Sequence, residues 1–272
     1  MEYVEAGGAR VPVIGLGTWD LRGRTCIEMV SAALKLGYRH IDTAAAYNNE
    51  QEVGEGLRAS GVRRDEVHVT TKVWHDQLRA ADFERAAAAS LKRLGVDRID
   101  LLLIHWPNSS VPLQETIGAL NKAKRDGLTR HIGVSNFTVE LIDEAVKRSE
   151  EPLVTNQIEL HPYLNQSKVI AACRKYGVSI TAYSPIARGK AAGDRLLAKI
   201  GAAHRKTSAQ VCLRWLVQQE IVAIPRTSNC ERLKENLDVF DFALSDEEIA
   251  AISALGKKSG RIVNMAWPPA WD

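Results

Sequence analysis

The sequence predicts a (β/α)8 barrel (a TIM barrel) with an N-terminal β-hairpin plug and a short C-terminal tail. Eight short apolar runs alternate with longer amphipathic segments along the 272 residues. Their spacing is about 30 residues, which is typical of one strand–helix unit. No Pro/Gly/Ser-rich linker divides the chain. We therefore expect a single barrel domain over residues 1–272, with a doubly wound sheet as the alternative.

The apolar runs have the branched, nearly continuous hydrophobic character of parallel strands that helices cover. We expect the eight strands at Ile14–Thr18, His40–Ala44, Val67–Val73, Ile99–His105, His131–Ser135, Val154–Leu160, Ser179–Pro185 and Ile221–Arg226.

The amphipathic segments predict helices, and a glycine follows several of them. Glycine stops a helix because it enters the left-handed conformation at little cost. Residues Thr138 and Ser245 precede acidic residues and predict helix starts. Helices with a following glycine are expected at Cys26–Leu36, Ala81–Leu94, Leu113–Arg125 and Ser167–Tyr176.

Two segments fall outside the repeat. Tyr3–Pro12 has Gly7-Gly8 at its centre and predicts a hairpin that plugs the amino-terminal mouth of the barrel. Gly256–Asp272 is irregular and rich in Trp and Pro, so we expect it on the surface or over a mouth.

Composition excludes several classes of protein. Lys plus Arg number 36 against 33 Asp plus Glu, a net charge of +3 that is too balanced for a nucleic-acid-binding protein. The apolar runs are too short for a membrane span, and the N-terminus lacks the apolar core of a signal peptide. The four cysteines are dispersed, which indicates neither a metal site nor a disulfide framework. We expect a cytoplasmic monomer that acts on a small molecule.

Polar residues at the strand ends predict a site, because the carboxyl ends of barrel strands meet at one mouth. Asp42, Lys72 and His105 end three consecutive strands, and Tyr47 lies in the loop after the first of them. Each has a simpler explanation alone, as a helix cap, a surface charge, a core histidine or a packed ring. Together they converge, and a buried lysine needs a partner.

These four residues support a carbonyl reduction. The pKa of tyrosine, about 10, has to fall by 2–3 units before it is a good acid near neutral pH. A nearby Lys72 ammonium supplies this shift, Asp42 holds Lys72, and His105 orients the substrate oxygen. The hydride would have to come from a nicotinamide cofactor.

The segment Ile224–Asn236 is the best phosphate-binding candidate, because a strand end runs into a helix start there. Paired Arg226 and Arg232 suit a 2′-phosphate and favour NADPH. Tyr183 offers a ring face for the nicotinamide. The polar side chains suited to its carboxamide are Ser135, Asn136 and Gln157. An ordinary helix start with surface arginines, and core packing of the tyrosine, remain alternatives.

Two other motif-like segments do not indicate a function. Gly54-Glu-Gly56-Leu-Arg-Ala59 matches GxGxxA, but it lies in a helical stretch with no strand directly before it, so we interpret it as a chance match. Gly133-Val-Ser135 lacks the last glycine of GxSxG.

The ordered motifs resemble the aldo-keto reductases over nearly the whole chain. The matching segments are Gly15–Trp19, Gly37–Glu50, Thr71–Trp74, Asp100–Pro107, Gly133–Phe137, Asn156–Glu159, Tyr183–Pro185 and Ile224–Asn236. The resemblance implies Tyr47 as proton donor, with Lys72, Asp42 and His105 around it. It also implies NADPH bound without a Rossmann fold. The implied cofactor contacts are Ser135, Asn136, Gln157, Tyr183, Ser184, Pro185, Arg226, Thr227, Ser228, Arg232, Glu235 and Asn236.

Within the family, the chain looks most like short bacterial reductases of 2,5-diketo-D-gluconate and methylglyoxal. The loop Asn108–Pro112 and the tail are brief, which suggests an open pocket for small polar carbonyls. The expected substrate contacts are His105, Trp19, Trp74, Trp106 and Trp267. The family usually has Lys-Ser where this chain has Arg226-Thr227, and Ile186–Asp194 is a short version of the loop that covers the cofactor.

Two alternatives remain from other functional classes. One is a non-catalytic, NADPH-binding or structural protein on the same barrel, which an eroded set of catalytic residues would indicate. The other is a sugar-phosphate isomerase, which would not depend on a nicotinamide cofactor.

Overall fold

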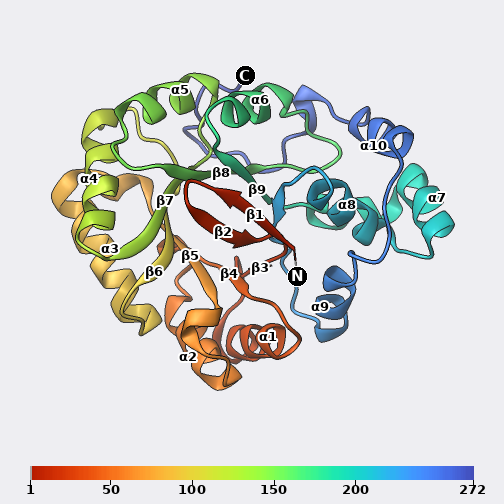
Figure 1. Ribbon diagram of the computed structural model, residues 1–272, viewed down its shortest axis with the longest axis horizontal. Helices are drawn as coiled ribbons and strands as arrows, with labels where there is room; N and C mark the ends of the chain where they lie inside the picture. The colour runs from red at the N-terminus through yellow and green to blue at the C-terminus, as the bar shows by residue number, and fades with distance from the viewer. Residues whose placement is uncertain (1) are drawn as a thin grey trace.

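The computed structural model describes residues 2–272, in which eight parallel strands form a barrel surrounded by helices (Figure 1). All eight predicted strands are present. They are β3 (Leu16–Gly17), β4 (His40–Asp42), β5 (His68–Val73), β6 (Ile99–Ile104), β7 (Thr129–Ser135), β8 (Leu153–Glu159), β9 (Ser179–Tyr183) and β10 (Val222–Ala223).

The barrel closes where the first and last strands meet. The strands pair in sequence order from β3 to β10, which excludes the doubly wound alternative. At the seam, Gly15 N donates to Ala223 O at 2.9 Å and Gly17 N donates to Pro225 O at 3.1 Å. A Cβ on Gly17 would lie 2.7 Å from the carbonyl oxygen of Ile224, so the seam requires glycine there.

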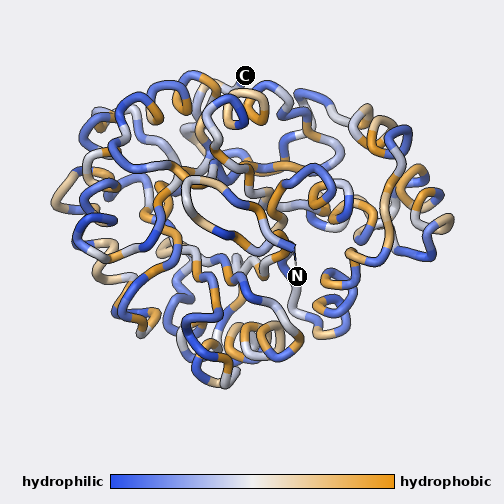
Figure 2. The backbone as a smooth tube through the Cα atoms, viewed as in Figure 1, coloured by the Kyte–Doolittle hydropathy of each residue, from blue (hydrophilic) through white to orange (hydrophobic). Residues whose placement is uncertain are grey.

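The helices form the outer layer, and Figure 2 shows hydrophobic and hydrophilic residues alternating along them. The predicted caps are confirmed: Thr138 Oγ1 accepts from Leu141 N, and Ser245 forms a capping box with Glu248. The helices are α1 (Gly23–Lys35), α2 (Glu50–Ser60), α3 (Ala80–Leu94), α4 (Leu113–Arg125), α5 (Val139–Arg148), α6 (Ser167–Lys175), α7 (Arg195–His204), α8 (Ser208–Val217), α9 (Cys230–Leu237) and α10 (Asp246–Ser253). None is long and apolar enough to cross a membrane within residues 2–272.

The predicted hairpin consists of β1 (Tyr3–Ala6) and β2 (Ala9–Pro12), which pair antiparallel. Its turn residues Gly7 and Gly8 have φ values of 54° and 78°, where glycine is favoured. In Figure 1 the hairpin lies across the centre of the barrel. Its turn approaches the beginning of β8 at Leu153 and Val154, which places it at the amino-terminal mouth as predicted.

The GxGxxA match lies inside α2, and its glycines serve helix packing. A Cβ on Gly54 would lie 2.1 Å from the Leu94 carbonyl oxygen on α3. One on Gly56 would lie 2.9 Å from the Ile27 carbonyl oxygen on α1. Both glycines therefore let α2 approach its two neighbours closely, in agreement with our rejection of a dinucleotide motif.

Candidate active site

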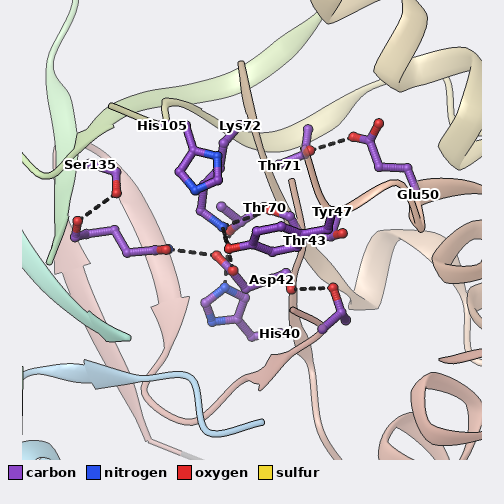
Figure 3. Close-up of polar contacts among 12 residues, drawn as sticks. His40, Asp42, Thr43, Tyr47, Glu50, Thr70, Thr71, Lys72, His105 and Ser135 are labelled. Atoms are coloured by element: carbon purple, nitrogen blue, oxygen red, sulfur yellow. Dashed lines mark hydrogen bonds and ion pairs between the residues drawn. The ribbon is translucent and has the colours of Figure 1, made fainter. Parts of the chain in front are cut away.

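A buried ion pair lies at the centre of the carboxyl-terminal mouth (Figure 3). The Nζ atom of Lys72, at the end of β5, lies 2.6 Å from Oδ1 of Asp42, at the end of β4. It also donates to the Thr43 carbonyl oxygen at 2.8 Å. Both charged side chains are almost fully buried. Burial is costly for single charges, so each charge stabilises the other here.

The loop after β4 brings Tyr47 to this pair. Its Oη atom lies 3.4 Å from Lys72 Nζ, and the ammonium lies 5.0 Å from the centre of its ring. Asn49 fixes the loop, because its Nδ2 atom donates to the carbonyl oxygens of Thr18 and Leu21. The structure thus brings together Tyr47, Lys72 and Asp42 as the sequence predicted.

The predicted direction of the Tyr47 pKa shift is wrong. Burial of the phenol, with a further contribution from Asp42, raises the pKa of Tyr47 well above 10. Burial also lowers the pKa of Lys72. The sequence argument considered the ammonium alone, but desolvation disfavours a buried phenolate and the neighbouring carboxylate repels it. Tyr47 therefore holds its proton at neutral pH.

His105 faces the same point from the end of β6. Its ring centre lies 5.6 Å from that of Tyr47, with the planes at 76°. Burial, with a contribution from Lys72, holds the pKa of His105 well below its usual range. Among residues 2–272, its Nδ1 atom has no hydrogen-bond partner. The imidazole is thus neutral at physiological pH, as the orienting role requires.

Aromatic rings line the mouth beside His105. Trp74 lies 4.9 Å from His105 between ring centres, and Trp267 of the tail lies 6.0 Å from Trp74 and 6.1 Å from Trp106. The tail therefore lies over the mouth that holds the catalytic candidates. Trp19 has a different neighbour from these rings: it is 50 % exposed, and the Arg188 guanidinium carbon lies 5.0 Å from its ring centre.

The predicted nicotinamide contacts form one hydrogen-bonded cluster across β7, β8 and β9. Ser135 Oγ donates to the Gln157 carbonyl oxygen at 2.8 Å, and Tyr183 Oη donates to Asn136 Oδ1 at 2.8 Å. The Gln157 amide donates to Asp42 Oδ2 at 2.7 Å, so it also holds the carboxylate that pairs with Lys72. The sequence did not predict this link.

The predicted phosphate segment is a strand end followed by a helix, as expected. Arg232 and Ser228 are exposed, and Asn229 caps α9 by accepting from Glu231 N. Arg226 is also exposed, and its Nη2 atom donates to the Asp20 carbonyl oxygen at 3.2 Å.

Three further residues of this segment are hydrogen-bonded to neighbouring residues or buried. Thr227 Oγ1 accepts from Asn229 N at 3.0 Å, and Glu235 Oε1 accepts from Thr207 Oγ1 at 2.5 Å. Asn236 is buried.

The loop after β9 is tightly wound, because Ser184, which precedes Pro185, and Arg188 have φ values near 50°. Exposed guanidiniums at one end and amide groups with a tyrosine ring at the other fit a dinucleotide.

Metal-binding side chains form no comparable cluster in the described part of the chain. Within residues 2–272, no group of three or more His, Cys, Asp or Glu side chains is arranged to hold a metal ion.

Sequence reasoning gave no role to Glu159, although it lies in a quoted motif. Its side chain is fully buried at the end of β8, two residues beyond Gln157, and its carboxylate accepts hydrogen bonds from Ile262 N and Val263 N of the tail. The signal available in the sequence was an acidic residue at a strand end, on the same face as Gln157.

The chain is similar to known proteins over most of its length. The sequence profile of the Aldo/keto reductase family matches residues 13–257. The methylglyoxal reductase DkgB of Escherichia coli O157:H7 is 42% identical over 265 residues, covering 96% of this chain and 99% of the relative.

Two solved structures extend the likeness to the fold. A protein proposed to be a 2,5-diketo-D-gluconic acid reductase B is 48% identical, with a TM-score of 0.98, covering 100% of this chain and 98% of the other. An aldo-keto reductase of Bombyx mori in complex with NADP is 35% identical, with a TM-score of 0.89, covering 96% of this chain and 95% of the other. The chain belongs to the aldo/keto reductase family and is an oxidoreductase that reduces carbonyl groups.

Proposed function

We propose that the protein is an NADPH-dependent reductase of small polar aldehydes and ketones, with Tyr47 as the general acid. The observation that carries this proposal is the placement of the Tyr47 hydroxyl 3.4 Å from a buried ammonium that is itself paired with Asp42 at 2.6 Å. Methylglyoxal and keto-sugar acids are the proposed substrates, in keeping with the names of the relatives.

Tyr47 begins the reaction with its proton in place, because burial raises its pKa well above 10. As negative charge develops on the carbonyl oxygen, the phenol transfers its proton to that oxygen. The phenolate left behind lies beside the Lys72 ammonium, whose attraction stabilises it. Asp42 keeps Lys72 charged and in place. Lys72 therefore acts on the product side of the proton transfer rather than by lowering the pKa of Tyr47 before the reaction.

His105 orients the substrate oxygen toward Tyr47. Its low pKa keeps the ring neutral, so it donates a hydrogen bond without protonating the substrate first. Trp74 packs beside His105, and Trp106 packs against Trp267 of the tail, so these rings would form the apolar part of the substrate pocket.

The nicotinamide cofactor would supply the hydride. Ser135, Asn136 and Gln157 would bind its carboxamide, and Tyr183 would face its ring. At the other end Arg226 and Arg232 would bind the 2′-phosphate, which favours NADPH over NADH. Thr227, Ser228, Glu235 and Asn236 would complete the adenosine end, and Ser184 and Pro185 would also contact the cofactor.

The direct test follows the loss of NADPH absorbance at a series of carbonyl concentrations. We expect faster turnover of methylglyoxal and keto-sugar acids than of long hydrophobic aldehydes, and a higher kcat/KM with NADPH than with NADH. Turnover that favours long hydrophobic aldehydes would contradict the proposed substrate class. Absence of NADPH oxidation with every carbonyl would support the non-catalytic alternative instead.

A further inference from the structure

The tail after α10 is held to the barrel by a small number of polar contacts, and Glu159 makes the central ones. Its Oε1 atom accepts from Ile262 N at 2.6 Å, and its Oε2 atom accepts from Val263 N at 2.9 Å. The Arg261 guanidinium lies 4.0 Å from Oε2. Hydrogen bonds from two consecutive backbone groups to one buried carboxylate are charge-assisted and hold the backbone in one place.

The neighbourhood of Glu159 is arranged to keep its carboxylate an acceptor. His161 Nδ1 accepts from Tyr163 N at 3.3 Å, so the ring proton is on Nε2, which donates to Glu159 Oε1 at 3.1 Å. Glu159 is therefore surrounded by donors. The register of β8 and β9 sets Glu159 opposite Tyr183, at the carboxyl ends of both strands, so its carboxylate lies at the same end of the barrel as the candidate active site.

The far end of the tail is held at a second point. The Asp272 side chain accepts from Val139 N at the start of α5, at 3.1 Å. Trp271 stacks on Arg261, with 3.4 Å between the guanidinium carbon and the ring centre. Between the two attachment points, Trp267 lies 3.7 Å from His75 and 6.0 Å from Trp74 between ring centres. The tail thus carries one wall of the proposed substrate pocket.

The packing of the tail against the barrel is incomplete. A cavity of about 260 Å³ lies behind it, lined by Gln166, Lys258, Arg261, Asn264 and Trp271 among others. Trp267 is 38 % exposed. The polar contacts of Glu159 with Ile262 and Val263 therefore add to the packing of Trp267 against His75 in holding this part of the tail.

We propose that Glu159 is a positioning residue for the carbonyl substrate: it ties residues 261–263 to the end of β8 and so sets the place of Trp267 in the pocket wall. This inference rests on the proposed function. Glu159 touches neither the proton donor nor its ion pair, so its loss acts on substrate binding more than on the chemical step.

Two variants test the proposal from both partners of the contact. Glu159→Gln keeps the volume but sets an amide NH2 against a backbone donor. Ile262→Pro removes one of the two backbone donors, and Arg261 already has φ −62° and ψ 133°, which suit a residue before proline. Glu150→Gln is the matched control, because that carboxylate pairs with Arg125 on the surface.

The first readout requires no turnover. Trypsin does not cleave a bond that precedes proline, so in Ile262→Pro the bond after Arg261 is resistant. Cleavage after Lys258, in the 3-10 helix Lys258–Gly260 of the tail, is therefore compared in all four proteins. This bond is cut when the tail leaves the barrel, and we expect both variants to be cut about tenfold faster than the parent protein and the control. Equal rates in all four proteins would overturn the proposal. Because Ile262→Pro leaves the buried carboxylate in place, it decides the question if Glu159→Gln fails to fold.

The second readout separates positioning from general damage. At saturating NADPH, we expect the KM for methylglyoxal to rise about tenfold, with kcat within about threefold and the KM for NADPH unchanged. An unchanged carbonyl KM in a variant whose tail is released would overturn the proposal, as would a fall in kcat alone. If the parent protein reduces no carbonyl, the proposed function fails, and the trypsin rates alone decide whether Glu159 holds the tail.

Discussion

The Gln157 amide donates a hydrogen bond of 2.7 Å to the Asp42 carboxylate, joining strands β8 and β4 across the barrel mouth. The other carboxylate oxygen of Asp42 binds Lys72. A residue proposed to contact the nicotinamide therefore shares a partner with the ammonium beside Tyr47. Cofactor binding and proton transfer meet at one carboxylate, which makes each of these side chains a sensitive place for substitution.

Replacing Tyr47 by Phe removes the proposed acid and leaves the ring. Because general acid catalysis contributes roughly 10²–10⁴-fold, we expect kcat for methylglyoxal to fall at least about a hundredfold. Steady-state kinetics at saturating NADPH measure it. Tyr3→Phe, on the hairpin at the opposite end, is the control and should keep full activity. A Tyr47→Phe enzyme with parental kcat would overturn the assignment.

Replacing Lys72 by Met leaves the Asp42 carboxylate buried without its cation. Breaking a buried ion pair in this way costs about 3–5 kcal/mol, so we expect a fall of this order in the free energy of unfolding together with loss of activity. Urea denaturation measures the change. Lys147→Met breaks an exposed pair with Asp143 on α5 and should leave the urea midpoint unchanged. Similar midpoints for the two variants would contradict the prediction.

Burial, partly offset by Asp42, lowers the pKa of His40, and burial holds that of His105 well below its usual range. In the unfolded chain each titrates near 6.5, so the unfolded state binds more protons below that pH. Stability is therefore complete above about pH 6.5 and falls as the pH drops, by up to about 1.4 kcal/mol per pH unit for each histidine. Urea denaturation between pH 8 and pH 5 measures this slope. His40→Asn should make it shallower, and an unchanged slope would contradict the prediction.

Arg226 and Arg232 are proposed to select NADPH. Reversing the charge of the exposed Arg232 to Glu should raise the KM for NADPH by about tenfold or more and leave that for NADH nearly unchanged, because only NADPH carries the 2′-phosphate. Kinetics with both cofactors measure the ratio. Arg85→Glu on α3 is the matched control. Equal effects on both cofactors would place the 2′-phosphate elsewhere.

Replacing Gly17 tests the closure of the barrel, and replacing Gly118 in α4 is the comparison. A Cβ at Gly17 would lie 2.7 Å from the Ile224 carbonyl oxygen, so Gly17→Ala should lower the free energy of unfolding by about 1–3 kcal/mol. Gly118 in α4 has open space around it, and Gly118→Ala should raise stability by roughly 0.5–1 kcal/mol. Thermal and urea unfolding check both signs. A neutral Gly17→Ala would mean that the seam can open without cost.

The sequence predicted the strands and the caps well, because their patterns are local. Apolar runs, glycines after helices and the residues Thr138 and Ser245 each act within a few positions of the chain. The two strands at the seam are shorter than predicted: β3 and β10 have two residues each. Their length depends on how the barrel closes, which no local pattern records.

That the candidate residues lie close together was predictable, and their pKa values were less so. Barrel topology brings Asp42, Lys72 and His105 to one mouth wherever the strands end correctly. The pKa of Tyr47 could not be predicted from one neighbour, since its direction depends on the competition between burial, a carboxylate and an ammonium. The contact of Glu159 with Ile262 joins residues 103 positions apart and depends on the path of an irregular tail.

The hairpin of β1 and β2 closes one end of the barrel, and all the proposed chemistry lies at the other. His40 lies next to the hairpin, and Gly7 and Gly8 form the turn of the hairpin. These residues contribute to stability and have no part in the proposed substrate and cofactor sites. This separation makes the enzyme a convenient subject for engineering: the hairpin end can be redesigned for heat or acid tolerance, and the opposite rim can be varied independently to change which carbonyls are accepted.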